Sequence, residues 1–246
     1  MNDDVALLTN HRVSRQFNSN KGGHLRGIVA VLVPFVIVSL IGGYLGTDIS
    51  FASALVINLA YLLAIVIATV VLKAQGCGWR DLGLARPESW PKTIVMSLGA
   101  LLAIIAALIV FQIILMNLPG QVMQPSNQSE YNPLIGNLLL FLVMLVAAWT
   151  LVAFGEEMLF RAFLLNSLAG SFGTLKARWA LALAGSSLLF GLAHYDWGIA
   201  GIIETMIVGL VLGSIYLRTG RNLWVTIIAH GLINTLKFSL VYAGLV

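Results

Sequence analysis

The chain has 246 residues, of which 59% are hydrophobic and only 10% are charged, and its mean hydropathy is +0.93. Soluble globular domains are about one quarter charged, so this composition excludes a soluble protein and indicates an integral membrane protein. The single cysteine excludes an intrachain disulfide and a thiolate metal cluster. The net charge of +4 does not indicate a nucleic-acid partner, because the basic residues lie in short loops between apolar stretches.

The apolar stretches predict an all-α transmembrane bundle with about seven spans. Residues 1–25 are polar and are expected to form a flexible tail. Residues 26–246 are expected to form one transmembrane domain, because this length leaves no room for a second soluble domain. The first apolar run, of roughly 20 residues, is too long for a cleavable signal peptide. The predicted spans are 26–46, 51–72, 93–117, 134–168, 178–194, 199–217 and 223–245.

The segment between the second and third spans, residues 73–92, differs from the other connections. It contains a Trp-Arg-Asp-Leu-Gly-Leu run at 79–84 and two later prolines, Pro87 and Pro91. We expect a loop with a short interfacial helix whose aromatic side chains lie at the level of the lipid headgroups.

The basic residues predict the orientation of the bundle. Twelve of the fourteen Lys and Arg residues lie in the N-terminal tail and in the loops after spans two, four and six. The other three loops contain none. Because basic loops stay on the cytoplasmic side, we expect a cytoplasmic N-terminus and a C-terminus on the far side.

Three ionisable residues in the fourth span need an explanation, because charges within a bilayer are costly. Glu157 and Arg161 are four residues apart, so they share a helix face and can neutralise each other. Glu156 is turned about 100° from Glu157 and lacks that partner. One carboxylate is therefore expected to be structural and the other available for chemistry. The alternative is an ordinary helix end at the membrane surface.

Two histidines lie in later spans. His194 follows Phe190 by four residues, and Asn234 follows His230 by four, so each pair shares one helix face. His194 lies beside a turn and is also compatible with an interfacial position. His230 lies about 13 Å of helix beyond the preceding turn, a depth at which a polar residue should face the bundle interior.

These residue types support two kinds of peptide-bond chemistry. A glutamate and a histidine can hold a water molecule, remove its proton and direct the hydroxide at a carbonyl. A side-chain amide or second imidazole can stabilise the oxyanion by roughly 3–4 kcal/mol. Two imidazoles and a carboxylate can instead bind a catalytic zinc. The spacing does not decide between them, and the His-Glu-x-x-His zinc motif is absent.

Read together, the three groups resemble the CPBP family, which comprises type II CAAX prenyl endopeptidases and bacteriocin-processing or immunity proteins, also called Abi. The similarity covers residues 134–245, which we take as the expected catalytic core. The matching motifs, in chain order, are Glu156-Glu157-x-x-x-Arg161, Phe190-x-x-x-His194 and His230-x-x-x-Asn234.

This resemblance implies an intramembrane endopeptidase. In such an enzyme Glu156 would activate the water molecule and His194 would help to hold it. His230 and Asn234 would stabilise the oxyanion. We expect these four side chains to converge in one interior pocket, because each buried polar group would be costly if left unpaired.

The resemblance also implies supporting roles and leaves metal use open. Glu157 and Arg161 would brace the helix. Members of the family have been described both as metalloproteases and as metal-independent glutamic proteases. We expect no cofactor, because only Glu156, His194 and His230 offer themselves as ligands; if zinc is used, these three would bind it.

The expected partners are a membrane-associated peptide or protein substrate, such as a prenylated or leader peptide, and the lipid bilayer, with no nucleic acid. We expect a multi-pass protein of a prokaryotic plasma membrane, and the sequence assigns no oligomeric state. One alternative function is a non-proteolytic membrane scaffold or bacteriocin-immunity protein with the same pocket. A proton-coupled transporter is disfavoured, because internal repeats with paired broken helices are absent.

Overall fold

The computed structural model describes residues 21–45, 51–117 and 129–245, and its regular elements within these ranges are all helical. Five helical segments are long and apolar enough to cross a membrane. The expected all-α membrane bundle is therefore confirmed, whereas the count of seven crossings stays a prediction. The long helical segments are α2 (Lys21–Leu45), α3 (Phe51–Ala74), α4 (Trp90–Asn117), the continuous run α5 to α7 (138–171), α8 (Arg178–Leu192), α9 (Gly198–Arg218) and α10 (Leu223–Tyr242).

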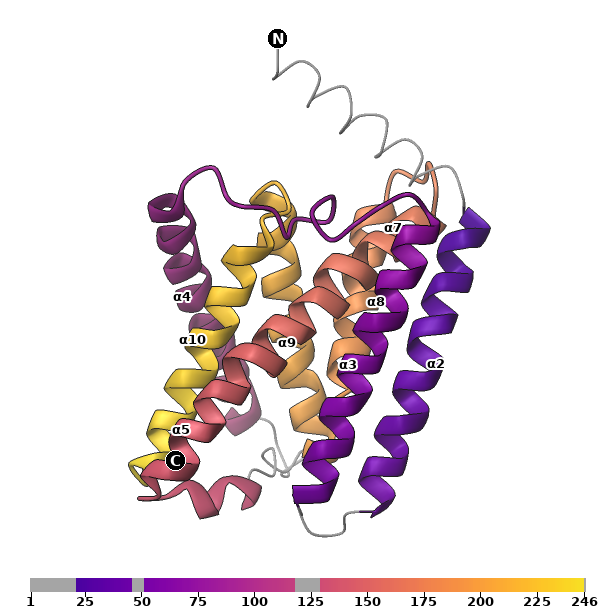
Figure 1. The fold of residues 1–246 in the computed structure, drawn as a ribbon. Coiled ribbons are helices and arrows are strands. Elements are labelled where there is room, and N and C mark those ends of the chain that lie inside the picture. The colour runs from indigo at the N-terminus through magenta and orange to yellow at the C-terminus, as the bar shows by residue number, and fades with distance from the viewer. Residues whose placement is uncertain (1–20, 46–50, 118–128, 246) are drawn as a thin grey trace.

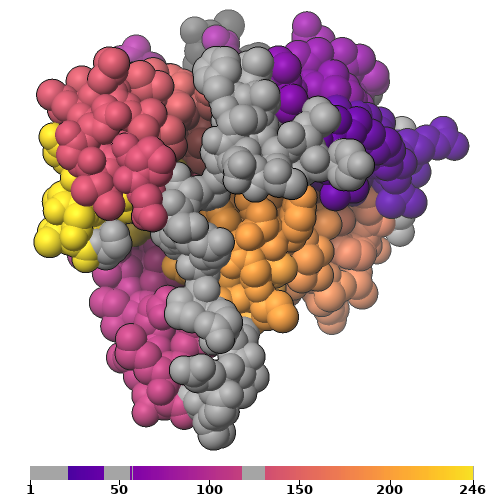
Figure 2. Space-filling view, turned by 90° about the horizontal axis from the view of Figure 1, so that it is seen from below, coloured from indigo at the N-terminus to yellow at the C-terminus, as the bar shows by residue number. Residues whose placement is uncertain are grey.

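Successive long helices run in alternating directions (Figure 1). The connections after α3, α7 and α9 lie at the same end of the molecule as the start of α2. Eight basic residues lie in these connections or in the adjoining helix turns, so the predicted sorting of charge to one end is present in the fold: Lys73, Arg80, Arg86, Lys92, Lys176, Arg178, Arg218 and Arg221. That this end is cytoplasmic stays a prediction. Both the side view and the view from the opposite end place α2 and α4 on opposite sides of the bundle (Figure 2).

The expected short interfacial helix between the second and third spans is wrong. Residues 75–89 form a series of turns, in which the hydrogen bonds of Asp81, Leu82 and Gly83 reach back only three residues. Glycines with positive φ at both ends of the run, Gly76 and Gly83, interrupt a regular helix. Leu82 is buried, so this connection packs on the protein.

The fourth span begins later than the sequence predicted. Residues 129–134 form a separate 3₁₀-helix, η1 (Ser129–Leu134), and Gly136 then adopts a positive φ of 68°. The Asn137 side chain accepts a hydrogen bond from the Leu140 amide at 3.1 Å and caps the start of α5 (Leu138–Ala147). From there the helix continues to Ser171, slightly beyond the predicted end at 168.

The first helix begins earlier than predicted. α2 starts at Lys21, so residues 21–25 are helical, although we expected them in the flexible tail. His24 is buried, and a Cβ atom added to Gly170 would lie only 2.6 Å from the His24 ring. The start of α2 therefore packs closely on α7 (Leu165–Ser171). Residues 1–20, the rest of the expected tail, lie outside the described residues.

The continuous helix from α5 to α7 contains two wide, π-helical segments. They are η2 (Ala148–Ala153) and η3 (Glu157–Leu164), separated by the short α6 (Phe154–Glu156). All eight residues of η3 are buried. The Asn166 amide donates hydrogen bonds to the backbone carbonyls of Arg161 and Ala162, at 3.2 and 2.8 Å, as the wide turn ends. The helix crosses the bundle diagonally and carries η3 through the core (Figure 1). Such π-helical turns are frequent at functional sites.

The connection 75–89 is fixed to the end of α9 and the start of α10 by long-range hydrogen bonds. One of them runs from the Trp224 indole to the Ala85 carbonyl at 3.0 Å. The Gly83 carbonyl accepts from the Leu223 amide at 3.1 Å. The Tyr216 hydroxyl donates to the Leu82 carbonyl at 2.7 Å. This docking holds the start of α10 against the rest of the bundle, and α10 carries one of the candidate histidines.

Replacing Gly83 with alanine should destabilise the protein. Gly83 has a φ of 98°, and a Cβ atom there would lie 1.8 Å from the Arg221 carbonyl oxygen. Strained backbone alone costs about 1–3 kcal/mol, and the clash adds to it. The matched control is Gly78→Ala, where the nearest atom would be 3.8 Å away. Thermal unfolding in one detergent should give a lower midpoint for Gly83→Ala than for Gly78→Ala; equal midpoints would contradict the docking described here.

Candidate active site

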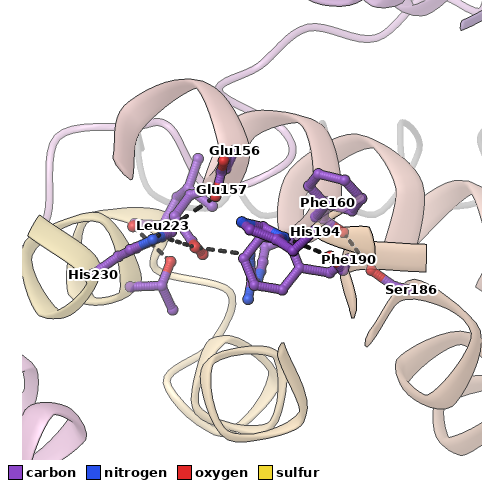
Figure 3. Close-up of polar contacts among 10 residues, drawn as sticks. Glu156, Glu157, Phe160, Ser186, Phe190, His194, Leu223 and His230 are labelled. Carbon is purple, nitrogen blue, oxygen red and sulfur yellow. Dashed lines mark hydrogen bonds and ion pairs between the residues drawn. The ribbon is translucent and has the colours of Figure 1, made fainter. Parts of the chain in front are cut away.

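The centre of the site is a buried carboxylate shared by two basic side chains. Oε1 of Glu157 lies 2.9 Å from Nη1 of Arg161 and 2.9 Å from Nδ1 of His230 (Figure 3). The three residues are 0%, 1% and 5% exposed, respectively. Because a carboxylate can only accept, Nδ1 of His230 carries the hydrogen. The expected pairing of Glu157 with Arg161 is present, and the pairing with His230 was not anticipated.

Phe190 connects the Glu157–Arg161 ion pair to His194. The Arg161 guanidinium carbon lies 4.3 Å from the centre of the Phe190 ring, which is a cation–π contact. The same ring meets the His194 ring at 5.0 Å and the His230 ring at 6.2 Å, both edge-on. Phe190 therefore packs against both imidazoles, and Figure 3 shows it between the helix of the glutamates and α8.

Glu156 is the second carboxylate of the site and is 4% exposed. Its Oε2 lies 3.8 Å from Nε2 of His230, which is too long for a direct hydrogen bond. Within the described residues, this oxygen makes no hydrogen bond. The two adjacent glutamates thus contact opposite nitrogens of one imidazole, one tightly and one loosely. The loosely held carboxylate oxygen is available to a further group.

Tyr61, from α3, is a site residue that the sequence reasoning missed. Its hydroxyl lies close enough to Glu156 for the two groups to interact electrostatically. Its ring meets the Phe35 ring edge-on at 4.9 Å. A tyrosine within an apolar span is common, and no charged residue lies near Tyr61 in the sequence. Only the fold brings it to Glu156, so no local signal could have identified it.

His194 lies just after the end of α8. Its Nδ1 lies 2.9 Å from the Phe190 carbonyl oxygen, which can only accept, so Nδ1 donates. In the neutral ring this leaves Nε2 as an acceptor. His194 is half-buried, and its ring meets the Trp197 ring at a tilt of 58°, with centroids 4.9 Å apart. Among the described residues, no hydrogen bond or ion pair joins His194 to Glu156.

Asn234 lies one turn after His230 on α10 and is half-buried. Its side chain makes no hydrogen bond to another described residue. Of the four expected catalytic residues, the fold therefore brings Glu156 and His230 into contact and links His194 to them through Phe190. The convergence of all four in one pocket stays a prediction.

Trp149, in η2, fixes α10 close to His230. A Cβ atom added to Gly231 would lie 2.5 Å from the Trp149 ring, so the indole packs directly on the helix backbone. The indole Nε1 donates a hydrogen bond to the Thr235 hydroxyl at 3.1 Å. These contacts position the helix segment that holds His230 and Asn234, and no local sequence pattern predicted them.

The expected alternative ligand set for zinc was Glu156, His194 and His230. Within the ranges that the structure describes, no three His, Cys, Asp or Glu side chains are grouped closely enough to hold a metal ion. Nδ1 of His230 donates to Glu157, as the second nitrogen of a metal-binding histidine often does, so Nε2 stays open. His194, however, reaches the cluster only through an aromatic ring. The expectation that no metal is used stays a prediction.

Replacing Glu157 with alanine should harm folding more than replacing Glu156 with glutamine. Without Glu157, both Arg161 and His230 lose the carboxylate between them, and breaking a buried ion pair costs about 3–5 kcal/mol. Glu156→Gln keeps the shape of the side chain and breaks no close ion pair. Unfolding midpoints and yields of monodisperse protein measure the difference. An equal loss for both variants would contradict this division of roles.

Comparison with known protein families finds one match, which covers the site. Residues 138–236 match the family described as Rce1-like, the type II CAAX prenyl endopeptidases. No match was found among curated proteins or among solved structures. The matched segment runs from the start of α5 into α10 and contains Glu156, Glu157, Arg161, Phe190, His194, His230 and Asn234. This segment of the chain is therefore similar to the Rce1-like, type II CAAX prenyl endopeptidases.

Proposed function

We propose that the protein hydrolyses a peptide bond in a membrane-associated or hydrophobic substrate, using a water molecule activated by Glu156. The observation that supports this proposal is that one oxygen of the buried Glu156 carboxylate is available to bind a further group. Oε2 of Glu156 makes no hydrogen bond within the described residues and lies 3.8 Å from Nε2 of His230. A group that hydrogen-bonds at about 2.8 Å can bridge two atoms at this separation.

Glu157 orients the His230 imidazole toward the reaction. Nδ1 of His230 donates to Glu157, so Nε2 faces Glu156. When Nε2 carries a hydrogen, it can donate to an oxyanion that develops beside it. Glu157 would act by orienting the imidazole, and its role would extend beyond bracing the helix.

The remaining residues complete a hydrolytic cycle. Glu156 removes one proton from the water, and Nε2 of His194 accepts the hydrogen bond of the other. The hydroxide adds to the peptide carbonyl, and its oxyanion is stabilised by His230 and by the Asn234 amide. Glu156 then transfers the abstracted proton to the leaving amine. The bond to nitrogen breaks, and a new carboxyl and a new amine are formed.

Burial strengthens each of these interactions. Glu156 and His230 are 4% and 5% exposed, so little water screens the charge that develops in the transition state. The donors are held in place before the reaction, because Glu157 fixes His230 and Trp149 fixes the surrounding helix. A preorganised donor avoids the cost of reorientation during the reaction.

The substrate we propose is a peptide that reaches the site from the bilayer. The family description names prenylated CAAX proteins, and bacterial leader peptides are a second membrane-associated class. A farnesylated peptide ending in a CAAX sequence, its unprenylated counterpart and a hydrophobic peptide library distinguish these classes when tested on the purified protein in lipid. The rival function, a non-proteolytic scaffold, predicts that none of them is cleaved.

Glu156→Gln should abolish cleavage while leaving the fold intact. General-base catalysis contributes typically 10²–10⁴-fold, so kcat should fall by about that factor. The KM for the peptide should change little, because the amide keeps the shape of the carboxylate. Mass spectrometry of the products measures cleavage, and the unfolding midpoint monitors the fold. Cleavage by Glu156→Gln at the wild-type rate would exclude the proposed mechanism.

Activity should survive removal of metal ions. Asn234 is a poor zinc ligand but a good oxyanion donor, and it lies one turn from His230. Its placement supports His230 as a donor instead of a ligand. Exhaustive chelation should leave the cleavage rate unchanged, and metal analysis of the purified protein should find zinc well below one equivalent. Stoichiometric zinc that is lost together with activity, and restores it when added back, would contradict metal independence.

A further inference from the structure

The buried side-chain amide of Asn166, in α7, joins the wide turn η3 to the end of the bundle that holds the basic connections. Asn166 is 2% exposed. Its Nδ2 donates to the backbone carbonyls of Arg161 and Ala162, at 3.2 and 2.8 Å, and to the Tyr216 hydroxyl at 2.9 Å. Its Oδ1 accepts from Nη1 of Arg221 at 3.1 Å. One amide is therefore bonded to η3, to α9 and to the turn that follows α9.

The partners of this amide permit only one orientation. A guanidinium can only donate, so Arg221 must face Oδ1 of Asn166, and a backbone carbonyl can only accept, so the wide turn must face Nδ2. The Tyr216 hydroxyl donates to the Leu82 carbonyl at 2.7 Å, which leaves its oxygen to accept from Nδ2. A flipped amide would set Oδ1 against two carbonyl oxygens. Asn166 is thus held in a single orientation.

The amide meets the wide turn at the point where the backbone needs a donor. The Leu165 amide bonds to the Phe160 carbonyl, five residues back, as in a π-helix. Where a helix returns to bonds that reach four residues back, the acceptor advances by one position, and one carbonyl loses its backbone donor. The next two carbonyls are those of Arg161 and Ala162, and Asn166 donates to both. Because a buried carbonyl without a partner is costly, this amide stabilises the end of the wide turn.

The segment that Asn166 holds also anchors the site. The Arg161 carbonyl accepts from the amide, and the guanidinium of the same residue lies 2.9 Å from Oε1 of Glu157. That oxygen also accepts from Nδ1 of His230 (Figure 3). Contacts therefore run from Asn166 through the ion pair to the imidazole. A shift of the Arg161 backbone would move the ion pair and, with it, the nitrogen of His230 that faces Glu156.

We propose that Asn166 is a positioning residue for the reaction: it holds the end of the wide turn and, through the ion pair in that turn, the orientation of His230. This inference rests on the proposed function, in which His230 stabilises the oxyanion. It makes the geometry of the site depend on two connections at the basic end, 75–89 and 219–222, because Leu82 and Arg221 fix the network around the amide. Asn166 acts through the ion pair and need not touch the substrate.

The first test measures the position of His230 without any substrate. In protein with isotope-labelled histidine, the NMR shift of the His230 Nδ1–H proton reports its bond to Glu157, and the signal is identified by its absence from His230→Gln. Asn166→Leu removes the amide and keeps a side chain of similar size, so this signal should shift. An unshifted signal would overturn the proposal.

The matched control is Tyr216→Phe, which removes a different hydrogen bond of the same amide. The ring stays in place, and the bonds from Asn166 to the wide turn remain. Both variants should lower the unfolding midpoint, because each loses buried hydrogen bonds. Only Asn166→Leu should move the His230 signal. An equal shift in the two variants would assign the effect to general loosening of the fold and would contradict the inference.

A second pair of variants keeps the inference testable if Asn166→Leu does not fold. Asn166→Ser and Asn166→Ala are similar in size, but the serine hydroxyl can donate to the carbonyl four residues back, here that of Ala162. The His230 signal should therefore lie nearer to its wild-type position in Asn166→Ser than in Asn166→Ala. The same shift in both would show that the donor at this position does not matter.

The last test uses the reaction. With whichever peptide the wild type cleaves, Asn166→Leu should lower kcat by roughly tenfold, because a misplaced catalytic group slows the reaction. KM should stay near its wild-type value, and Tyr216→Phe should keep the wild-type kcat. A loss confined to KM or to the unfolding midpoint would indicate a purely structural role and overturn the proposal.

Glu156→Gln, assayed in parallel, separates failure of this inference from failure of the proposed function. If Glu156→Gln is inactive and Asn166→Leu keeps both the wild-type kcat and the wild-type His230 signal, only the role of Asn166 is wrong. If Glu156→Gln cleaves normally, the proposed function itself fails. A shifted His230 signal with an unchanged kcat would show that the network reaches the imidazole without positioning it for catalysis, which also overturns the inference.

Discussion

The Glu157 carboxylate is the constraint on which the rest of the site depends. It is fully buried, and moving an ion into the interior costs several kcal/mol unless partners compensate for the lost water. The compensation comes from both sides: Arg161 lies on the same helix, and His230 comes from α10, 73 residues later. Satisfying one carboxylate therefore fixes the relative positions of η3 and α10. Because Arg161 in turn packs on Phe190, the same requirement also positions α8.

The helix that carries this carboxylate contains a wide, π-helical turn that affects how the two glutamates face His230. In a regular α-helix, adjacent residues diverge by about 100°, so two neighbouring glutamates would face different partners. Here the helix changes to a π-helical turn at Glu157, and both glutamates contact opposite nitrogens of His230. The wide turn is stabilised where it ends, by Asn166, and it is held against α8 by the Ser186 hydroxyl, which donates to the Phe160 carbonyl at 2.8 Å. The π-helical turn of the backbone is thus linked to the contacts that the two glutamates make with His230.

Much of the fold could be predicted from the sequence, because long apolar runs and the sorting of basic residues follow directly from the physics of the bilayer. The pairing of Glu157 with Arg161 was also accessible, since it depends only on helical spacing. The boundaries at 129–137 and the turns at 75–89 were mistaken, because capping by Asn137 and docking of Gly83 on Leu223 decide them. The contacts of Tyr61, Trp149 and His230 are tertiary, so no local pattern encodes them. The π-helical turns likewise have no signature in the order of apolar and polar residues.

Glu156 is proposed to act on water as a base and faces a histidine that Glu157 orients. The most direct test is a single turnover of a cleaved peptide in water enriched in heavy oxygen, followed by mass spectrometry of both product and protein. We expect one heavy oxygen in the new carboxyl group of the product and none in Glu156. Heavy oxygen in Glu156 together with an unlabelled product would show that the glutamate attacks the substrate itself, and would contradict the account.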